Sequence, residues 1–461
     1  MDTRKISDAR VTIKSSMNGH TVEESPMPGQ DTLHLKGRPR VLVQDHGGCP
    51  SSAPSFAVPR LLPVEGLRAY LALWVLGCHA LWLAGYPADA LAGLPKLIAM
   101  GWYAVDLFII ISGFVIMLSL DKQRETYLQF IIRRFFRLFP VFIVLFVVAI
   151  PLSQVSLWNV THASQYLTPD LIENFTDKME SWWENIQWNI PLHLLMLHGV
   201  VPEVLVKDAP GAFLVPAWSV SLEWQFYLVA PLAYAWAVSA RPYRRLGLCA
   251  LCLVLVLASR YVLPTVLYGA ALPFHVKFFF LGAASYFLYQ RQAAHQLSDT
   301  AFPVACCLAL FLFGLSGRAW DLIPVGLWMA FLGLLLEHPS SLSSRLVSPL
   351  LTNPFVLYLG RISYSLYLSH VLVIIVIQYA LLTWAPNLSR IVHFGVLLTC
   401  TTAVSIAVST VLYRCVEAPG IHAGRYLARQ LAARRAVGPQ DAMFFPRRAG
   451  DESLVRGRNC D

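Results

Sequence analysis

Ten apolar segments run along this chain, and each is long enough, or nearly so, to cross a lipid bilayer as a helix. They cover residues 61–84, 101–120, 138–155, 217–236, 246–264, 272–289, 301–315, 320–336, 355–382 and 391–412. A membrane-spanning helix needs about 17 to 25 apolar residues, and in lipid it satisfies its backbone polar groups internally. We therefore predict an all-α fold, a polytopic integral membrane helix bundle of about ten transmembrane helices.

The composition agrees with this prediction. Hydrophobic residues make up 56% of the chain and charged residues only 14%, whereas ordinary soluble domains have about 25% charged residues. The two short segments, 301–315 and 320–336, are separated by a brief turn and are expected to form a tight hairpin. Residues 190–201 are too few to span and carry two histidines, so we interpret them as a re-entrant or interfacial segment.

The arginines indicate the orientation, because Lys and Arg collect in short cytoplasmic loops. The connections predicted to lie on the inner side hold Arg133, Arg134, Arg137, Arg241, Arg244, Arg245, Arg291 and Arg345, and Arg414, Arg425, Arg429, Arg434 and Arg435 follow the last span. Both termini are therefore expected in the cytoplasm of a multi-pass protein of the plasma (cell inner) membrane. The net charge of +9 fits this topology better than nucleic-acid binding, so we expect membrane lipid and no nucleic acid among the partners.

Three regions follow from the distribution of apolar residues. Residues 1–60 lack apolar periodicity and are expected to be a disordered cytoplasmic tail. Residues 61–420 are expected to form the membrane domain, and residues 421–461 a basic cytoplasmic tail. No short charged segment directly precedes the first span, so we expect no cleavable signal peptide. The long external loop, 156–216, holds four tryptophans that suit either an interfacial belt, which we favour, or a platform for sugar rings.

Cys249 and Cys252 have CxxC spacing but lie within an apolar span, where cysteine acts as a small hydrophobe. We therefore expect no metal site.

Arg68 and His79 are ionisable residues inside the first apolar segment. Eleven residues return a helix to within roughly 20° of its starting direction and separate the two side chains by about 16 Å. The two therefore face one side of the span at two depths. Ionisable groups inside membrane helices cost about 2.5 kcal/mol or more and usually mark a pathway or a site.

His79, Asp106 and Glu223 each lie about six residues, or roughly 9 Å, below the predicted outer end of their spans. A carboxylate beside a histidine fixes its tautomer and raises its basicity, which suits removal of a proton from a hydroxyl. Alternatively, Asp106 and Glu223 satisfy backbone amides or pair with a neighbouring Ser, Trp or Tyr.

Arg68 lies toward the predicted cytoplasmic end of its span, where a guanidinium can bind phosphates bidentately. Alternatively, its side chain extends along the helix so that the guanidinium reaches the lipid–water interface. Arg133, Arg134 and Arg137 could likewise be a positive-inside anchor, or could hold a phosphorylated donor together with Arg68.

Several motifs, in order, resemble the membrane-bound acyltransferase family 3. They are PVEGLRA (63–69) with His79, AVDLFIIISGF (104–114), FIIRRFFRLFP (130–140) with its RxxR, WSVSLEWQFYL (218–228) with its SxxxE, FFFLG (278–282), GRISYSLYLSH (360–370) and VEAP (416–419). The similarity covers about residues 61–420. Two positions differ from the family pattern, because Trp224 stands where a second acidic residue is common and Ser369 where an aromatic often precedes the histidine.

The resemblance implies an acyl-CoA donor, usually acetyl-CoA, loaded from the cytoplasm, and an acceptor hydroxyl on a glycan or lipid-linked glycan. We expect no permanently bound cofactor, because acyl-CoA is a substrate. Our hypothesis makes His79 the general base, oriented by Asp106 or Glu223, with Ser219 or a backbone amide near the oxyanion. A covalent acyl relay through a side chain is the alternative.

In the same hypothesis, Arg68, Arg134 and Arg137 bind the CoA phosphates. His370, Tyr364 and Glu417 are candidates of second rank, and His370 could equally be a buried histidine bonded to Tyr364 or to a backbone carbonyl.

Two other functions fit ten spans with intramembrane charges. A secondary transporter would favour two inverted repeats with interrupted helices, and the chain shows no convincing internal duplication, since its polar motifs concentrate in the first four spans. A non-catalytic glycan-carrier protein would use the tryptophan-rich external loop and would consume no acyl-CoA.

Overall fold

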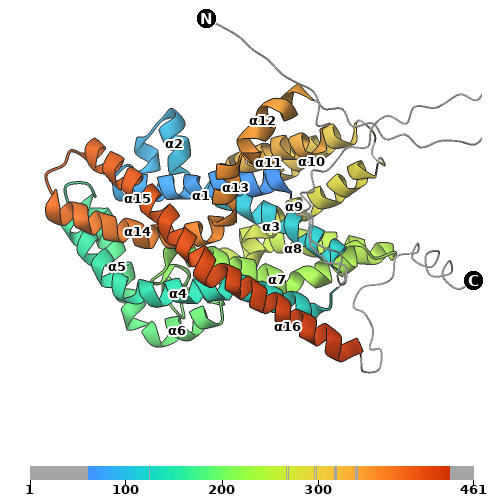
Figure 1. The fold of residues 1–461 in the computed structure, drawn as a ribbon, viewed down its shortest axis with the longest axis horizontal. Coiled ribbons are helices and arrows are strands. Elements are labelled where there is room, and N and C mark those ends of the chain that lie inside the picture. Colours follow the sequence, from blue (N-terminus) through green and yellow to red (C-terminus); the bar gives the residue numbers. More distant parts are fainter. Residues whose placement is uncertain are drawn as a thin grey trace, which may run out of the picture. The chain divides into compact units, whose positions relative to one another are not determined.

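The computed structural model describes residues 61–436, apart from residues 124, 266, 268, 295, 297, 299, 316–318 and 338–340. Residues 1–60 and 437–461, which belong to the two predicted tails, lie outside the described part. The regular structure of the described residues is helical (Figure 1). The α-helices are α1 (Leu62–Leu83), α2 (Gly93–Ala99), α3 (Trp102–Lys122), α4 (Tyr127–His162), α5 (Pro169–Glu184), α6 (Ile186–Leu194), α7 (Trp218–Ala237), α8 (Pro242–Tyr261), α9 (Leu272–Ala293), α10 (Ala301–Leu315), α11 (Leu322–Leu336), α12 (Leu342–Thr352), α13 (Pro354–Arg361), α14 (Ser363–Trp384), α15 (Arg390–Leu412) and α16 (Ala418–Ala436). The short helices are η1 (Ala88–Ala90), η2 (Ala209–Gly211), η3 (Val215–Ala217), η4 (Leu263–Thr265), η5 (Ala319–Asp321) and η6 (Tyr413–Glu417).

Six helical stretches of the described part are long and apolar enough to cross a membrane. They are Leu62–Leu83, Trp102–Lys122, Tyr127–His162, Pro242–Tyr261, Ser363–Trp384 and Arg390–Ala433. Two shorter apolar helices, Ala301–Gly314 and Leu322–Leu336, coincide with the predicted hairpin. The predicted all-helical membrane bundle is thus found, while ten crossings and the placement of the termini stay predictions.

Helix α4 is much longer than the predicted third span, 138–155. It begins with a capping box, in which Thr126 and Gln129 each accept a hydrogen bond from the other's backbone N–H. At about 1.5 Å per residue its 36 residues extend about 54 Å, which exceeds the hydrocarbon thickness of about 30 Å. Residues 130–140, expected to be a cytoplasmic loop, therefore form the first turns of a helix that holds the arginines in place.

The predicted external loop, 156–216, is also largely helical, because α4 continues into it and α5 and α6 follow. Trp182 is 5% exposed and donates a hydrogen bond of 2.8 Å to Asp208, so it belongs to the core and to neither a lipid belt nor a sugar platform. Trp188 remains exposed. The segment 190–201 lies partly in α6 and partly in the turns after it.

The predicted ninth span, 355–382, is broken in two. Asn353 caps α13 by accepting from the backbone N–H of Val356, and α13 ends before Ile362, where α14 begins a new axis. Only α14 has the length and hydropathy of a span. The apolar run misled the prediction because mostly apolar residues continue on both sides of the break.

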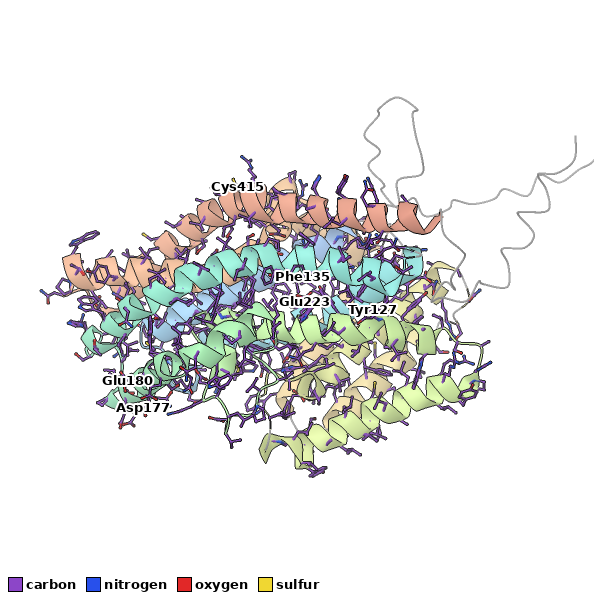
Figure 2. The ribbon with its side chains drawn as sticks, turned by 90° about the horizontal axis from the view of Figure 1, so that it is seen from below. Tyr127, Phe135, Asp177, Glu180, Glu223 and Cys415 are labelled. Atoms are coloured by element: carbon purple, nitrogen blue, oxygen red, sulfur yellow. The ribbon has the colours of Figure 1, made fainter. Side chains whose placement is uncertain are left out.

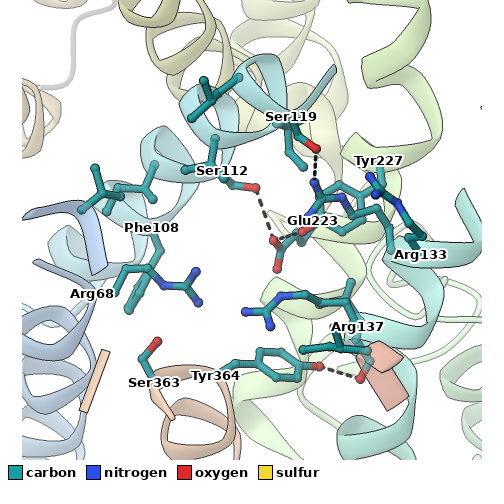
Figure 3. Close-up of a pocket in the computed structure, with 18 of the residues that line it drawn as sticks. Arg68, Phe108, Ser112, Ser119, Arg133, Arg137, Glu223, Tyr227, Ser363 and Tyr364 are labelled. Atoms are coloured by element: carbon teal, nitrogen blue, oxygen red, sulfur yellow. Dashed lines mark hydrogen bonds between the residues drawn. The ribbon is translucent and has the colours of Figure 1, made fainter. Parts of the chain in front are cut away.

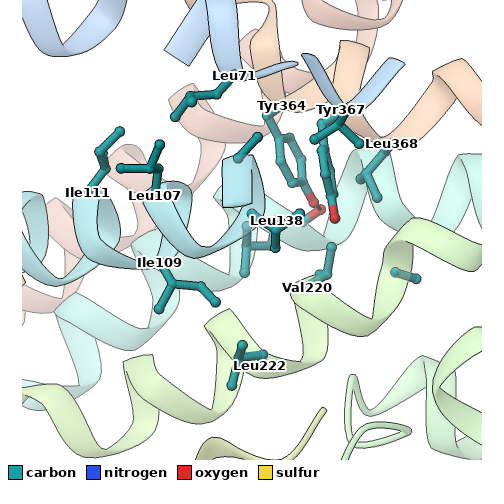
Figure 4. Packing of buried hydrophobic residues seen from close by; sticks show 14 of the residues in the cluster. Leu71, Leu107, Ile109, Ile111, Leu138, Val220, Leu222, Tyr364, Tyr367 and Leu368 are labelled. Atoms are coloured by element: carbon teal, nitrogen blue, oxygen red, sulfur yellow. Dashed lines mark hydrogen bonds between the residues drawn. The ribbon is translucent and has the colours of Figure 1, made fainter. Parts of the chain in front are cut away.

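Helix α3 is packed deepest, and two glycines let α9 approach it. A Cβ added to Gly113 would lie 2.4 Å from the Phe279 carbonyl oxygen, and one added to Gly282 would lie 2.0 Å from the Ile110 carbonyl oxygen. Small residues of this kind let membrane helices pack backbone to backbone. Branched side chains pack around α3 as well: Leu107, Ile109 and Ile111 lie in the buried cluster, and Figure 4 shows Ile109 pointing away from Leu107 and Ile111.

Candidate active site

A cavity of about 1350 Å³ lies between α1, α3, α4, α7, α14 and α16. Its lining is unusually basic for a membrane-embedded region, with seven arginines against three glutamates. The arginines are Arg68, Arg133, Arg134, Arg137, Arg361, Arg425 and Arg429. Arg68, Arg133, Arg134 and Arg137 are half-buried, whereas Arg361, Arg425 and Arg429 are exposed. Half-buried positive charge is costly unless an anion pairs with it.

Arg68 projects from α1 into this cavity. Figure 3 shows its guanidinium directed toward that of Arg137, with Glu223 on one side of the gap and Tyr364 on the other. The Nε atom of Arg68 is buried and has no hydrogen-bond partner among the described residues. Its charge is repelled by Arg137 and attracted by Glu223 and Glu417. Two converging guanidiniums form a fork that suits a phosphate oxygen.

Arg137 is anchored by a buried carboxylate at the far end of the chain. Its Nη1 lies 3.0 Å from Glu417, and Glu417 also accepts a hydrogen bond of 2.7 Å from Ser365. Glu417 closes η6, a turn of π-helix between α15 and α16, and π turns are frequent at functional sites. The predicted second-rank residue Glu417 therefore lies directly behind the cavity wall.

Arg134 is held on the same helix by different partners. Its guanidinium donates to the Ser119 hydroxyl at 2.9 Å and lies over the rings of Phe130 and Tyr227, 5.4 and 5.5 Å from their centroids. The RxxR spacing thus places Arg134 and Arg137 on one cavity wall in two fixed orientations.

Glu223 lines the cavity from α7, and Figure 2 shows it between α7 and the neighbouring α4. It accepts hydrogen bonds from Ser112, at 3.3 Å, and from Tyr227, one turn further along α7. Ser219, one turn before Glu223, lines the same cavity and its Oγ lies 3.0 Å from the Tyr367 hydroxyl. In Figure 4 the hydroxyls of Tyr364 and Tyr367 end beside each other, and Tyr364 donates to the Leu138 carbonyl at 2.8 Å.

His79 lies outside the lining of this cavity and pairs with His370. The Nδ1 atom of His79 is 3.0 Å from the Val75 carbonyl and 3.1 Å from Nε2 of His370, with ring centroids 5.0 Å apart. A carbonyl can only accept, so Nδ1 of His79 carries the proton. Its Nε2 then keeps a lone pair, which is the form that a general base requires.

The described contacts of the three residues predicted to share a layer differ. The Asp106 carboxylate lies 4.0 Å from the His275 ring, and the described partners of His79 are Val75 and His370. Glu223 lines the first cavity, and His79 does not. The layer of His79, Asp106 and Glu223 stays a prediction, because depth along each helix fixes neither its rotation nor its tilt.

A second cavity, of about 310 Å³, is lined by Asp208, Trp218 and His275 together with backbone around Gly211 and Gly269. Trp218 stacks obliquely on the His275 ring, with centroids 5.7 Å apart. Trp218 and Ser219 are consecutive residues that line different cavities.

The geometry brings together six of the predicted residues, Arg68, Arg134, Arg137, Ser219, Glu223 and Tyr364. It adds Ser112, Ser119, Tyr227, Arg425 and Arg429, which the sequence reasoning missed. Tyr227 was recognisable as the residue one helical turn after Glu223, whereas nothing in the spacing links α16 to this site.

A family model described as an acyltransferase domain matches residues 63–413. The chain is also 31% identical over 195 residues to acyltransferase MdmB of Streptomyces mycarofaciens. That match covers 42% of this chain and 44% of the relative, so it spans less than half of either protein. No solved structure matches the chain. Because the family model spans about three quarters of the sequence, the chain belongs to the membrane-bound acyltransferase family 3.

Proposed function

We propose that this protein is an O-acyltransferase of the cell inner membrane. It moves an acyl group, in the first place acetyl, from cytoplasmic acyl-CoA to a hydroxyl of a cell-surface polysaccharide, lipopolysaccharide or another glycan. Membership of an acyltransferase family supports the reaction class. The observation that carries the choice of donor is the arginine-lined cavity.

Three features of this cavity support a donor that carries phosphates. Arg68 and Arg137 converge in it, and planar guanidiniums bind phosphate bidentately. Its volume of about 1350 Å³ exceeds that of most sites for small ligands, about 300 to 1000 Å³. Apolar side chains such as Phe108 and Val220 line it as well, which suits the uncharged arm of CoA.

In the proposed reaction, the acceptor hydroxyl oxygen attacks the carbonyl carbon of the thioester. A C–O bond forms, the C–S bond breaks, and CoA leaves as a thiol. His79 accepts the hydroxyl proton at Nε2 and returns it to the leaving sulfur. Ser219 donates to the Pro216 carbonyl at 3.0 Å and lies beside the Tyr367 hydroxyl, so in this reaction its hydroxyl turns from Pro216 to donate to the developing oxyanion.

The route from the cavity to His79 passes Tyr367. This residue lines the cavity, and its ring centroid lies 6.1 Å from that of His370, the partner of His79. The thioester therefore has to reach the Tyr367 end of the cavity. Glu223 is a second proton acceptor inside the cavity, and the experiment below compares it with His79.

The second cavity is our candidate for the acceptor. Trp218 offers a ring face and Asp208 a carboxylate, the groups with which proteins stack on sugar rings and accept from their hydroxyls. Since the next residue, Ser219, lines the donor cavity, an acceptor bound there lies close to the donor.

The test uses membranes that contain the full-length protein, labelled acetyl-CoA and a panel of glycans. We expect label transfer by wild type, and loss of at least about a hundredfold in rate for His79→Ala and Arg68→Ala. A smaller loss in Glu223→Gln would assign the base to His79. The exposed residues His162 and Arg345 provide matched controls, His162→Ala and Arg345→Ala. Wild-type transfer by folded His79→Ala would disprove the assigned role, and glycan movement without any acyl transfer would favour the transporter.

A further inference from the structure

Helix α16 lies beyond the matched family region, which ends at residue 413. The sequence predicts a basic cytoplasmic tail from residue 421 onward, and residues 421–436 continue α16, which runs along α4 (Figures 1 and 2). The helix is therefore a candidate part of the site rather than an appendage.

Small residues fix α16 against α4. Gly420, Gly424 and Ala428 recur at intervals of four and so share one helix face. A Cβ at Gly424 would lie 2.7 Å from Cβ of Phe136, and one at Gly420 would lie 2.9 Å from the Phe136 carbonyl oxygen. Gln129 of α4 also donates to the Ala428 carbonyl at 3.2 Å. Close packing of this kind sets the rotation of α16 about its axis.

That rotation directs a basic edge of α16 to the cavity. Arg425 and Arg429, one turn apart, line it together with His422. Arg425 is close enough to Arg133 for their charges to repel, although Arg133 is already paired with Glu125 at 2.6 Å. The mouth of the cavity thus gathers arginines from two helices.

We propose that α16 forms the phosphate-binding wall of the donor cavity, with Arg425 and Arg429 binding phosphate groups of a nucleotide-bearing acyl donor. The proposal rests on the function proposed above and adds residues outside the family's matched region. Arg68 and Arg137 line the same cavity and are half-buried, whereas Arg425 and Arg429 are exposed. The chain therefore offers charge at both the mouth and the interior of the donor site.

An anionic lipid headgroup carries the same phosphate chemistry. The arrangement favours the nucleotide, because Arg425 and Arg429 line the cavity that Arg68 enters. The experiment separates the two sources by keeping anionic lipid out of one arm.

The test measures binding of coenzyme A and of phosphate-free pantetheine by calorimetry, with the full chain in phosphatidylcholine nanodiscs. We expect Arg425→Ala/Arg429→Ala to weaken coenzyme A binding about tenfold or more, and to leave pantetheine binding unchanged. Arg425→Lys/Arg429→Lys keeps the charges and should stay within about threefold of wild type. Arg244→Ala/Arg245→Ala, on α8 and outside the cavity lining, removes the same charge and should change nothing.

Unchanged coenzyme A binding by the alanine variant in phosphatidylcholine would overturn the inference. A second arm adds phosphatidylglycerol to the nanodiscs. If the alanine variant bound coenzyme A like wild type but no longer bound phosphatidylglycerol, the arginines would bind the lipid headgroup, and the inference would be overturned. If wild type itself bound no coenzyme A, the proposed function would fail with it. Both arginines are exposed, so folding is expected to survive, and the single variants give the same test with smaller effects.

Discussion

His79 is oriented by a carbonyl and a second histidine, where a carboxylate was expected. Both contacts involve Nδ1, so the other ring nitrogen is left available for proton transfer. His370 is completely buried and contacts the proposed base, so we propose it as a positioning residue.

We predict that His370→Phe lowers kcat about tenfold while the KM for acyl-CoA stays unchanged, because the phenyl ring fills the space without contacting Nδ1. His370→Gln, which restores a polar partner, should recover most of kcat. The measurement is the transfer rate per folded protein. If His370→Phe reduced the amount of folded protein but left kcat per folded protein unchanged, the role of His370 would be structural.

At the scale of residues, the sequence indicates which side chains are candidates for the site, but it does not predict which residues they contact. The eleven-residue spacing of Arg68 and His79 follows from helical geometry and needs no tertiary information. The partner of His79 lies 291 residues away, and the partner of Arg137 lies 280 residues away. Such pairs depend on how helices rotate against each other, which periodicity does not determine.

At the scale of elements, helix identity was predictable from apolar length, while several boundaries were not. Arg133, Arg134 and Arg137 indicate a cytoplasmic interface, and an interface predicts a loop. A helix can continue past that interface, and the capping box at Thr126 sets the true start of α4. Conversely, apolar residues make up most of both α13 and α14, so the apolar run hid the break between them.

The contact of α3 with α9 gives a second prediction. Gly282→Ala should lower the melting temperature in detergent by several degrees or prevent folding, because its Cβ would meet the Ile110 carbonyl oxygen at 2.0 Å. Gly395→Ala, on α15 with no described atom within 4 Å of its added Cβ, is the matched control. Equal melting temperatures for the two variants would contradict this packing.

The connection after α6 gives a third prediction, about pH. His193 and His198 are buried and stacked 4.0 Å apart, and burial lowers the pKa of His198 to about 4. Between the unfolded value of about 6.5 and this folded value, only the unfolded chain binds the proton. The free energy of unfolding should therefore decrease as the pH falls from 6.5 to 4, by about 3 kcal/mol over the whole range.

Denaturant unfolding in detergent from pH 7.5 to 4.5 measures this loss. His198→Asn keeps a donor for the Ala217 carbonyl, which His198 Nε2 contacts at 3.0 Å. It should reduce the pH dependence and leave the part that comes from His193, whose pKa burial also lowers. Replacing the exposed His162 by Gln should leave the pH dependence of stability as in wild type. Unchanged pH dependence in His198→Asn would assign the effect to another group.

At the scale of the whole molecule, the orientation in the membrane is a prediction from arginine distribution. Single cysteines in a cysteine-free chain test it with a membrane-impermeant maleimide. We expect Asp177→Cys on α5, an exposed position labelled in Figure 2, to react in intact cells. Arg245→Cys, exposed near the start of α8, should react only after permeabilisation. The reverse pattern would invert the predicted topology.

Glu417 has a consequence for the cavity when no donor is bound. Its bond to Arg137 makes it a resident counter-ion, so the empty site does not have to recruit an abundant cytosolic anion to offset that charge. On the function proposed above, a donor phosphate at Arg137 would have to compete with Glu417, which stays in the site and repels it. Selectivity would follow from this competition: inorganic phosphate, with few other contacts, would displace a buried carboxylate poorly, whereas a large donor that also engaged Arg68 would gain more.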